Sequence, residues 1–102
     1  MTGFKRGSTP VNTFDVDIDL TGATVFITYN QGEETVLEKA GADVAITPTQ
    51  LAVTLTQEET LAFTAADVDI QIRYVFPSGA ADGSDIIHTT AERILKDGVI
   101  TP

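Results

Sequence analysis

The chain contains no cysteine and no tryptophan, and it has a single histidine, His88. The lack of cysteine excludes disulfide frameworks, thiolate zinc sites and thiol redox chemistry. With one histidine in addition, a transition-metal catalytic centre lacks its usual ligands. A chain of 102 residues is nevertheless long enough to bury a core of its own. We therefore expect a fold that needs no disulfide, metal or other cofactor.

Positive charge is also scarce. Six Lys and Arg residues stand against fifteen Asp and Glu residues, which gives a formal net charge of −9 and an isoelectric point near 4.2. Two of the six cations, Lys5 and Arg6, lie in the first nine residues. Because nucleic acids and anionic lipid surfaces are bound through Lys and Arg, we predict that neither is a partner of this protein.

Long apolar runs are absent as well. The basic start MTGFKR is followed by GSTPVNT and not by an apolar stretch, so the sequence predicts no signal peptide. No segment approaches the roughly 20 apolar residues that a membrane-spanning helix requires. The expected place of synthesis is therefore the cytoplasm.

Alternating apolar and polar residues divide the chain into short predicted strands. Residues 1–9 show no periodicity, and we predict a flexible N-terminal arm there, followed by a single domain over residues 10–102. In Val11–Leu20 apolar side chains alternate with aspartates, which is typical of a strand with one buried face. Further strands are predicted at residues 23–29, 34–39, 44–47, 50–56, 68–76 and 86–95, with turn residues between them.

One segment departs from the strand pattern. Thr56 is followed three residues later by Glu59, the spacing of a capping box, so a single helical turn is predicted there. Leu61 and Phe63 are expected to reach the core from this turn. About seven strands with turns every 8 to 12 residues favour an all-β fold. Our first prediction is an antiparallel β-sandwich of immunoglobulin-like topology, and a small barrel is the alternative.

Asp15, Asp17 and Asp19 occupy every second position of the first predicted strand. A calcium-binding EF-hand loop starting at Asp15 would need Gly and Glu where the chain has Leu20 and Phe26. Two carboxylates on one strand face would stand about 6.6 Å apart, a separation that glycosidases also use. We interpret the row as a solvated face that discourages edge-to-edge pairing. A cation site and a catalytic pair are the alternatives.

His88 lies close in sequence to Ser84 and Asp85, so a Ser/His/Asp set can be written from this segment. In an extended chain, however, Ser84 and His88 would be about 13 Å apart, far beyond hydrogen-bond reach. Nucleophile-elbow and nucleotide-binding glycine motifs are absent. We therefore predict a non-catalytic protein, in which His88 is an ordinary strand residue or a pH-sensitive interface residue. The loop Asp82–Asp85 is interpreted as a hairpin or crossover loop, with cation binding as the alternative.

Five segments together resemble a known family. They are KRGSTP, ATVFITYNQGEETVLEK, LTQEETLAF, VDIQIRYVF and SDIIHTTAERILKDGVI. With them the chain resembles short proteins encoded in prophages of Gram-positive bacteria and, more distantly, the N-terminal β-sandwich of phage baseplate upper proteins. This resemblance implies a structural or assembly role in a phage tail or baseplate. It also implies synthesis in the host cytoplasm, the virion as a candidate destination, and no catalytic residues.

Two hypotheses of function from different classes follow. In the first, the protein is an interaction module whose basic arm binds an acidic face of another virion protein or of a second copy of the chain. Lys5, Arg6 and Pro10 are its candidate interaction residues. In the second, the protein is a carbohydrate- or cation-binding module that uses the aspartate row and the loop Asp82–Asp85. No assembled set of residues supports an enzyme.

Overall fold

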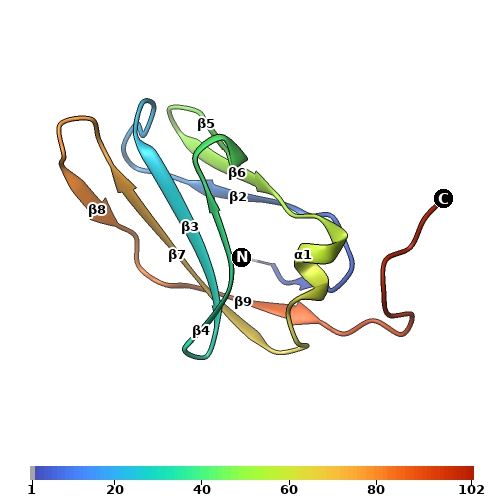
Figure 1. The fold of residues 1–102 in the computed structure, drawn as a ribbon. Helices are drawn as coiled ribbons and strands as arrows, with labels where there is room; N and C mark the ends of the chain where they lie inside the picture. Colours follow the sequence, from blue (N-terminus) through green and yellow to red (C-terminus); the bar gives the residue numbers. More distant parts are fainter. Residues whose placement is uncertain (1) are drawn as a thin grey trace.

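The computed structural model describes residues 2–102, and most of its regular structure is β (Figure 1). Its strands are β1 (Phe4–Lys5), β2 (Val11–Asp15), β3 (Thr24–Gln31), β4 (Glu34–Ala40), β5 (Val44–Ile46), β6 (Gln50–Thr54), β7 (Asp67–Val75), β8 (Ala81–Gly83) and β9 (Ile87–Glu92). A 3-10 helix, η1 (Gly41–Asp43), precedes β5, and a short helix, α1 (Gln57–Leu61), follows β6. Among the described residues, no helix is both long and apolar enough to cross a membrane.

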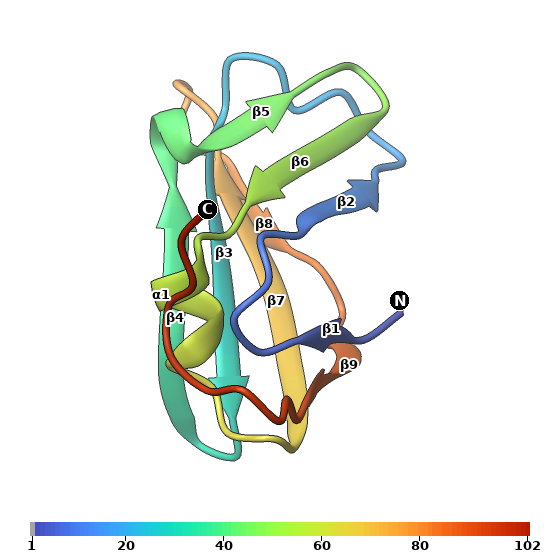
Figure 2. The ribbon, with the colours of Figure 1, turned by 90° about the vertical axis from the view of Figure 1, so that its right-hand side faces the viewer.

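The strands form two sheets. The larger sheet has the order β1-β9-β7-β3-β4, with β8 attached to β7, and the smaller sheet has the order β2-β6-β5. Figures 1 and 2 show the smaller sheet lying across one face of the larger one. The all-β prediction is confirmed. The larger sheet is mixed and not purely antiparallel, because β1 runs parallel to β9.

One core lies between the two sheets. Inward side chains at alternate positions of β3 and β7 pack against those of β2, β5 and β6, as expected for strands with one buried face. The cluster consists mainly of Val25, Ile27, Tyr29, Val68, Ile70 and Ile72 from the larger sheet, and Phe14, Val44, Leu51 and Val53 from the smaller one. Because both sheets contribute to a single cluster, they hold each other in place.

A hairpin forms at the turn predicted between residues 23–29 and 34–39. β3 and β4 are antiparallel, with Gln31 opposite Glu34, so Gly32 and Glu33 form the connecting turn. Gly32 has a φ of 63°, a left-handed conformation that glycine adopts without the steric cost of a side chain. β5 and β6 form the second hairpin, in which Val44 lies opposite Val53. The turn residues of the sequence therefore located the first hairpin, whereas the pairing of β5 with β6 comes from the structure.

The predicted helical turn is also confirmed. The backbone N–H of Glu59 donates to the Thr56 hydroxyl at 3.2 Å, and the Thr56 N–H donates to the Glu59 carboxylate at 2.9 Å. This reciprocal pair is the capping box that the Thr56 and Glu59 spacing indicated. Phe63 is fully buried just beyond the helix, whereas Leu61 is only half-buried. The turn thus places one aromatic ring in the core.

The first predicted strand is too long. β2 ends at Asp15, and residues 16–20 form bends and irregular chain instead of strand. Leu20 is buried, but Ile18 is 47% exposed, so the alternation is broken. The reason is the partner strand: β6 begins at Gln50, and beyond the bond from Val16 N–H to Thr49 C=O the ladder has no further residues to pair with.

The prediction of an unstructured N-terminal arm is wrong for the residues that the structure describes. Phe4 and Lys5 form β1, and the Phe4 side chain is buried in the core. The Phe4 ring stands edge-on to Phe63, with ring centroids 5.2 Å apart. A two-residue strand shows no periodicity, because alternation needs more positions than two. Its pairing with a strand from the other end of the chain was therefore invisible in the sequence.

The region after β7 also differs from the prediction. Residues 77–85 were expected to form a loop, but Ala81–Gly83 form β8 and pair with β7 across a tight turn at Gly79. All three β8 residues are exposed, so they carry no apolar alternation to indicate a strand. The last strand, predicted over residues 86–95, is shorter and spans Ile87–Glu92.

Candidate functional site

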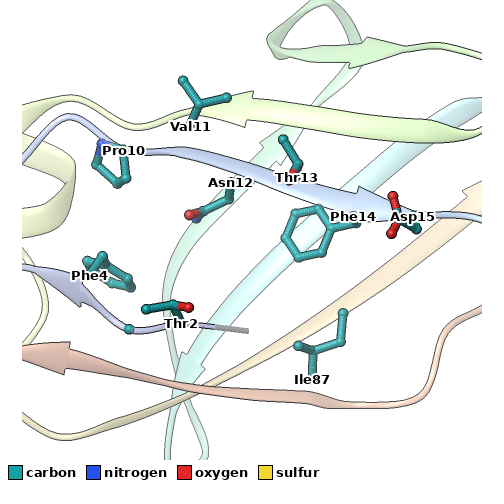
Figure 3. Close-up of a pocket in the computed structure, with 10 residues that line it drawn as sticks. Thr2, Phe4, Pro10, Val11, Asn12, Thr13, Phe14, Asp15 and Ile87 are labelled. Atoms are coloured by element: carbon teal, nitrogen blue, oxygen red, sulfur yellow. The ribbon is translucent and has the colours of Figure 1, made fainter.

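A groove separates the two sheets where the edge strands β1 and β2 lie near each other without pairing. Its volume is about 570 Å³, and Figure 3 shows its lining side chains. We call it the edge groove and define it by Thr2, Gly3, Phe4, Pro10, Val11, Asn12, Thr13, Phe14, Asp15 and Ile87. It combines a strand edge, an apolar base and one carboxylate, and each of these features has a structural cause.

The strand edge belongs to β2, whose only partner is β6. The flanking bonds, Leu55 N–H to Pro10 C=O and Val16 N–H to Thr49 C=O, fix the phase of the antiparallel ladder. In such a ladder the backbone groups of successive residues point alternately toward the partner and away from it. The N–H and C=O groups of Val11, Thr13 and Asp15 therefore point toward the groove. Within residues 2–102 they form no backbone bond outside the strand ladders.

The base of the groove is mainly apolar and buried. Phe4 and Phe14 line it, and both are buried. Between them, the Asn12 side-chain amide donates a hydrogen bond of 2.7 Å to the Tyr29 hydroxyl, which ties β2 to β3 through the core. Burial raises the pKa of Tyr29 to about 12, although the bond to Asn12 acts in the opposite direction. Tyr29 is thus neutral at physiological pH and rigidly placed.

The groove carries negative charge at one end. Asp15 is the one ionisable residue among its lining residues. A second hollow of about 330 Å³ continues from there along residues 15–20 toward Gly83 and Ser84, and it adds Asp17. Val11, at the opposite end, is 59% exposed. The open edge thus runs from an exposed apolar side chain to a pair of carboxylates.

The aspartate row does not form one face. Asp15 ends β2, whereas Asp17 and Asp19 lie in the irregular segment beyond it. Asp19 accepts a hydrogen bond of 2.9 Å from the Thr21 backbone N–H, and its bonds with Thr21 lower the pKa of its carboxyl group. This is the Asx-turn chemistry of a loop residue. In the part of the chain that the structure describes, no three Asp, Glu, His or Cys side chains gather as metal ligands do.

The structure does not bring Ser84, Asp85 and His88 together. The Ser84 hydroxyl accepts from the Ile72 N–H at 3.0 Å and donates to the Asp85 carbonyl at 2.8 Å. His88 instead lies 2.6 Å from Asp69, measured from Nδ1 to Oδ1, because β7 and β9 place these two residues opposite each other. The contribution of Asp69 was missed, since only the strand register reveals it. In the loop Asp82–Asp85, the Asp82 side chain accepts a hydrogen bond from the Gly83 N–H.

The three candidate interaction residues have different surroundings. The Arg6 guanidinium donates to the carbonyls of Phe63 and Leu61, at 2.7 and 3.1 Å, and lies 3.5 Å from Asp97. Lys5 is exposed and 3.7 Å from Glu92. The Pro10 carbonyl accepts the bond from Leu55, and its ring lines the edge groove. Arg6 therefore holds the fold together, and only Lys5 and Pro10 have surface available for a partner.

No protein-family model, curated protein or solved structure matches this chain. Its function must therefore be argued from its own geometry. An unpaired strand edge above an apolar base offers two kinds of contact to an extended peptide. Backbone hydrogen bonds come from the edge, and pockets for alternate side chains come from the base. This is the chemistry of peptide recognition by strand addition.

Proposed function

We propose that the protein is a non-catalytic interaction module that recognises a protein partner through the unpaired edge of β2. The outward backbone groups of Val11, Thr13 and Asp15 carry this proposal, because an exposed edge is a template for another strand. The length of β2, five residues, is enough for a short peptide to pair along it.

We further propose that the module is a structural or assembly part of a phage tail or baseplate. The support is the resemblance of its sequence segments, among them KRGSTP and LTQEETLAF, to prophage-encoded proteins. The acidic surface agrees with a protein partner and gives no attraction to nucleic acid or to an anionic membrane.

The non-catalytic part of the proposal is supported by the surroundings of the titratable side chains. His88 and Asp69 form a pair on the outer face of the larger sheet, where the His88 side chain is 77% exposed. No serine, threonine or lysine side chain makes a hydrogen bond with His88 among the described residues. A general base without a nucleophile in reach and without shelter from water gives little catalytic advantage.

The finer fold assignment also belongs to this proposal. We propose an immunoglobulin-like sandwich in which β2, β6 and β5 correspond to strands B, E and D, and β3, β7 and β9 to C, F and G. The support is the strand order of the two sheets and the short helix between β6 and β7. The small barrel would require hydrogen bonds between β1 and β2 that close the edge groove. Backbone amide exchange at Thr13, measured in a chain that lacks residues 98–102, distinguishes the two folds.

The phage role is tested by mass spectrometry of density-purified particles after prophage induction in the source strain. We expect peptides of this chain at stoichiometric levels in the particles. Intact particles that lack the protein, with the chain present only in the lysate, would remove the virion role and leave an assembly factor or an unrelated binder.

The alternative module, which binds a cation or a carbohydrate, is tested by calorimetric titration with calcium and a glycan panel. We expect heats no larger than those of dilution, because the aspartate row is divided between a strand and a loop. A saturable heat that disappears in an Asp15→Asn, Asp17→Asn double variant would instead favour the binding of a cation.

A further inference from the structure

Residues 95–102, which we call the C-terminal tail, expose apolar side chains without forming a strand. Leu95 is 92% exposed, Val99 50% and Ile100 54%. These three make up a large share of the big apolar side chains that the described residues present to solvent. The tail contains valine, isoleucine and threonine in succession, which are residues of high β-propensity. Such a segment gains from pairing with a strand edge.

The tail already offers its backbone in the manner of a strand. The Ile100 N–H donates to the Gln57 side-chain oxygen at 2.9 Å, and the Gln57 side-chain N–H donates to the Ile100 C=O at 3.0 Å. The amide of Gln57 thus takes the place of a peptide group on a neighbouring strand. Both bonds are exposed to water, so together they hold residues 98–102 only weakly.

We propose that residues 98–102 of one copy leave Gln57 and pair with the free edge of β2 in a second copy. The proposal rests on the interaction-module function argued above, but not on the phage assignment. β2 has five residues, and five residues of the tail, once extended, would span the same distance of about 17 Å. Val99 or Ile100, according to register, would then face the apolar base formed by Phe4 and Phe14.

The shape of the edge groove favours a single extended segment over the edge of another folded domain. β2 forms one wall, while Thr2, Phe4 and Ile87 lie on the opposite side (Figure 3). A whole sheet edge approaching β2 would meet this second wall. A tail that is one strand wide meets no such obstacle.

Charge favours the antiparallel direction of the tail relative to β2. Lys96 lies just before the pairing residues, and it forms none of the ion pairs found within residues 2–102. If the tail runs antiparallel to β2, Lys96 comes next to Asp15 and Asp17 at the acidic end of the groove. Pro102, which has no N–H to donate, then comes to the Val11 end. The parallel direction would place Lys96 beside the exposed apolar side chain of Val11.

This contact is heterologous, since each copy gives a tail and receives one. Head-to-tail contacts close into rings or grow into filaments, according to the rotation between copies. The test is sedimentation velocity on the full chain over a range of concentrations. We expect species larger than the monomer to increase with concentration. A full chain that is monomeric at every concentration, with no affinity for a synthetic peptide of residues 95–102, would overturn the proposal.

Two variants test the two sides of the proposed contact, which are the edge of β2 and residues 98–102. Thr13→Pro removes a backbone N–H that points into the groove, and the ladder to β6 does not use this group. We expect the loss of one backbone bond, and the bulk of the ring, to weaken tail binding about tenfold or more. Thr13→Val is the matched control, because it keeps the N–H and should keep the assembly. The second variant lacks residues 98–102 and should be monomeric. Thr13→Pro assembling as well as the unmodified chain would contradict the role of the edge.

Mixing the two defective variants gives the decisive result. The Thr13→Pro chain still has a tail and the shortened chain still has a groove, so together they should form a heterodimer that grows no further. Pairing of β2 with β2 would leave the shortened chain dimeric and give no rescue. A tail that folds back on its own groove would leave the unmodified chain monomeric at every concentration. Either result overturns the proposal.

One variant should strengthen assembly. Gln57→Ala removes both bonds that hold Ile100 within its own chain, so we expect assembly at lower concentration.

The titration of the shortened chain with the peptide of residues 95–102 needs no substitution in β2, and it therefore stays informative if Thr13→Pro does not fold. If the chain does not self-associate but still binds a protein of the phage particle, this inference is rejected and the proposed function stands.

Discussion

The two ends of the gap between the sheets are built in opposite ways. At the α1 corner, which we define by Arg6, Lys39, Glu59, Leu61 and Phe63, both cationic side chains have partners. Lys39 lies 2.7 Å from Glu59, and Arg6 donates to the carbonyls of Leu61 and Phe63. At the edge groove, the outward backbone groups of β2 have no strand beside them. Both ends share one apolar core. The difference therefore lies in the pairing of polar groups. They are paired at the α1 corner, which we call the clamp, whereas the outward backbone groups of β2 are left without a neighbouring strand at the edge groove.

The largest expected effect breaks the clamp at its centre. Phe63 is 1% exposed and stands edge-on to both Phe4 and Tyr29. Replacement by alanine should lower the free energy of unfolding by about 3–5 kcal/mol, because a buried ring leaves a cavity. Urea unfolding followed by far-ultraviolet circular dichroism measures this change. The matched control is Phe26→Ala, on the outer face of β3, and a loss as large there would contradict the comparison.

A smaller loss is expected when the charged part of the clamp is removed. Arg6→Ala deletes two hydrogen bonds to the carbonyls of Phe63 and Leu61, and its side chain is only 19% exposed. We expect a loss of about 2 kcal/mol, the usual scale for charged donors. Lys5→Ala, one residue away, removes only an exposed pair and should cost less than about 0.5 kcal/mol. Equal thermal shifts in the two variants would mean that β1 is not held by Arg6.

The next prediction concerns the polar contact that joins the groove to the core. Tyr29→Phe leaves the buried Asn12 amide without its acceptor, so stability should fall by about 1–2 kcal/mol. Tyr74→Phe is the control, since the described residues give the Tyr74 hydroxyl no hydrogen-bond partner. Chemical denaturation of the two variants makes the comparison. If both lose the same amount, the Asn12 contact contributes nothing.

Alkaline titration of Tyr29 tests the burial of the same side chain. Burial raises the pKa of Tyr29 from 10.0 to about 12 in the folded chain. Because the folded value lies above the unfolded one, this contribution to stability is present below pH 10 and is lost as the pH rises toward 12. Ultraviolet absorbance of the Tyr74→Phe variant reports on Tyr29 alone. Ionisation of that tyrosine near pH 10 in the folded protein would contradict its burial.

The smallest expected effect is the pH dependence of stability that Glu59 contributes at acid pH. Burial by itself would raise the pKa of Glu59, but hydrogen bonds with Lys39 and Thr56, together with the Lys39 charge, lower it below 4.5. A lowered folded pKa gives stability above the unfolded value, so this part is lost as the pH falls below about 4.5. Glu59→Gln should lower the free energy of unfolding by less than about 1 kcal/mol at neutral pH. It should also make the loss of stability at acid pH less steep. Glu58→Gln, at an exposed neighbouring position, should leave the loss of stability at acid pH unchanged. Thermal unfolding over a range of pH compares the two variants.

Long alternating segments and local motifs predicted most of the elements. β7 and the capping box at Thr56 are present where the sequence placed them, because both depend on contacts within a few residues. β1 and β8 were missed, because each is two or three residues long and is defined by a partner far away in the chain or across a turn. The length of β2 was overestimated, since its end depends on where β6 begins.

The candidate site was less accessible to prediction than the fold. The sequence drew attention to Arg6 as an interaction residue, but the tertiary structure directs its guanidinium to carbonyls of the α1 corner. It also drew attention to His88, yet the partner Asp69 is nineteen positions away and becomes visible only through the register of β7 and β9. The edge groove has no motif, because its donors are backbone groups that every residue possesses.

The sequence by itself determined the class of secondary structure, the turn between β3 and β4, the helical cap and the acidic charge. Each of these depends on side-chain type, on local spacing or on composition, and none requires knowledge of distant contacts. Only the tertiary structure decided which strands are neighbours and, in consequence, which edge stays unpaired. The physical reason is that a strand becomes an edge through the absence of a neighbour, and neighbours are set by the packing of the two sheets around their common core.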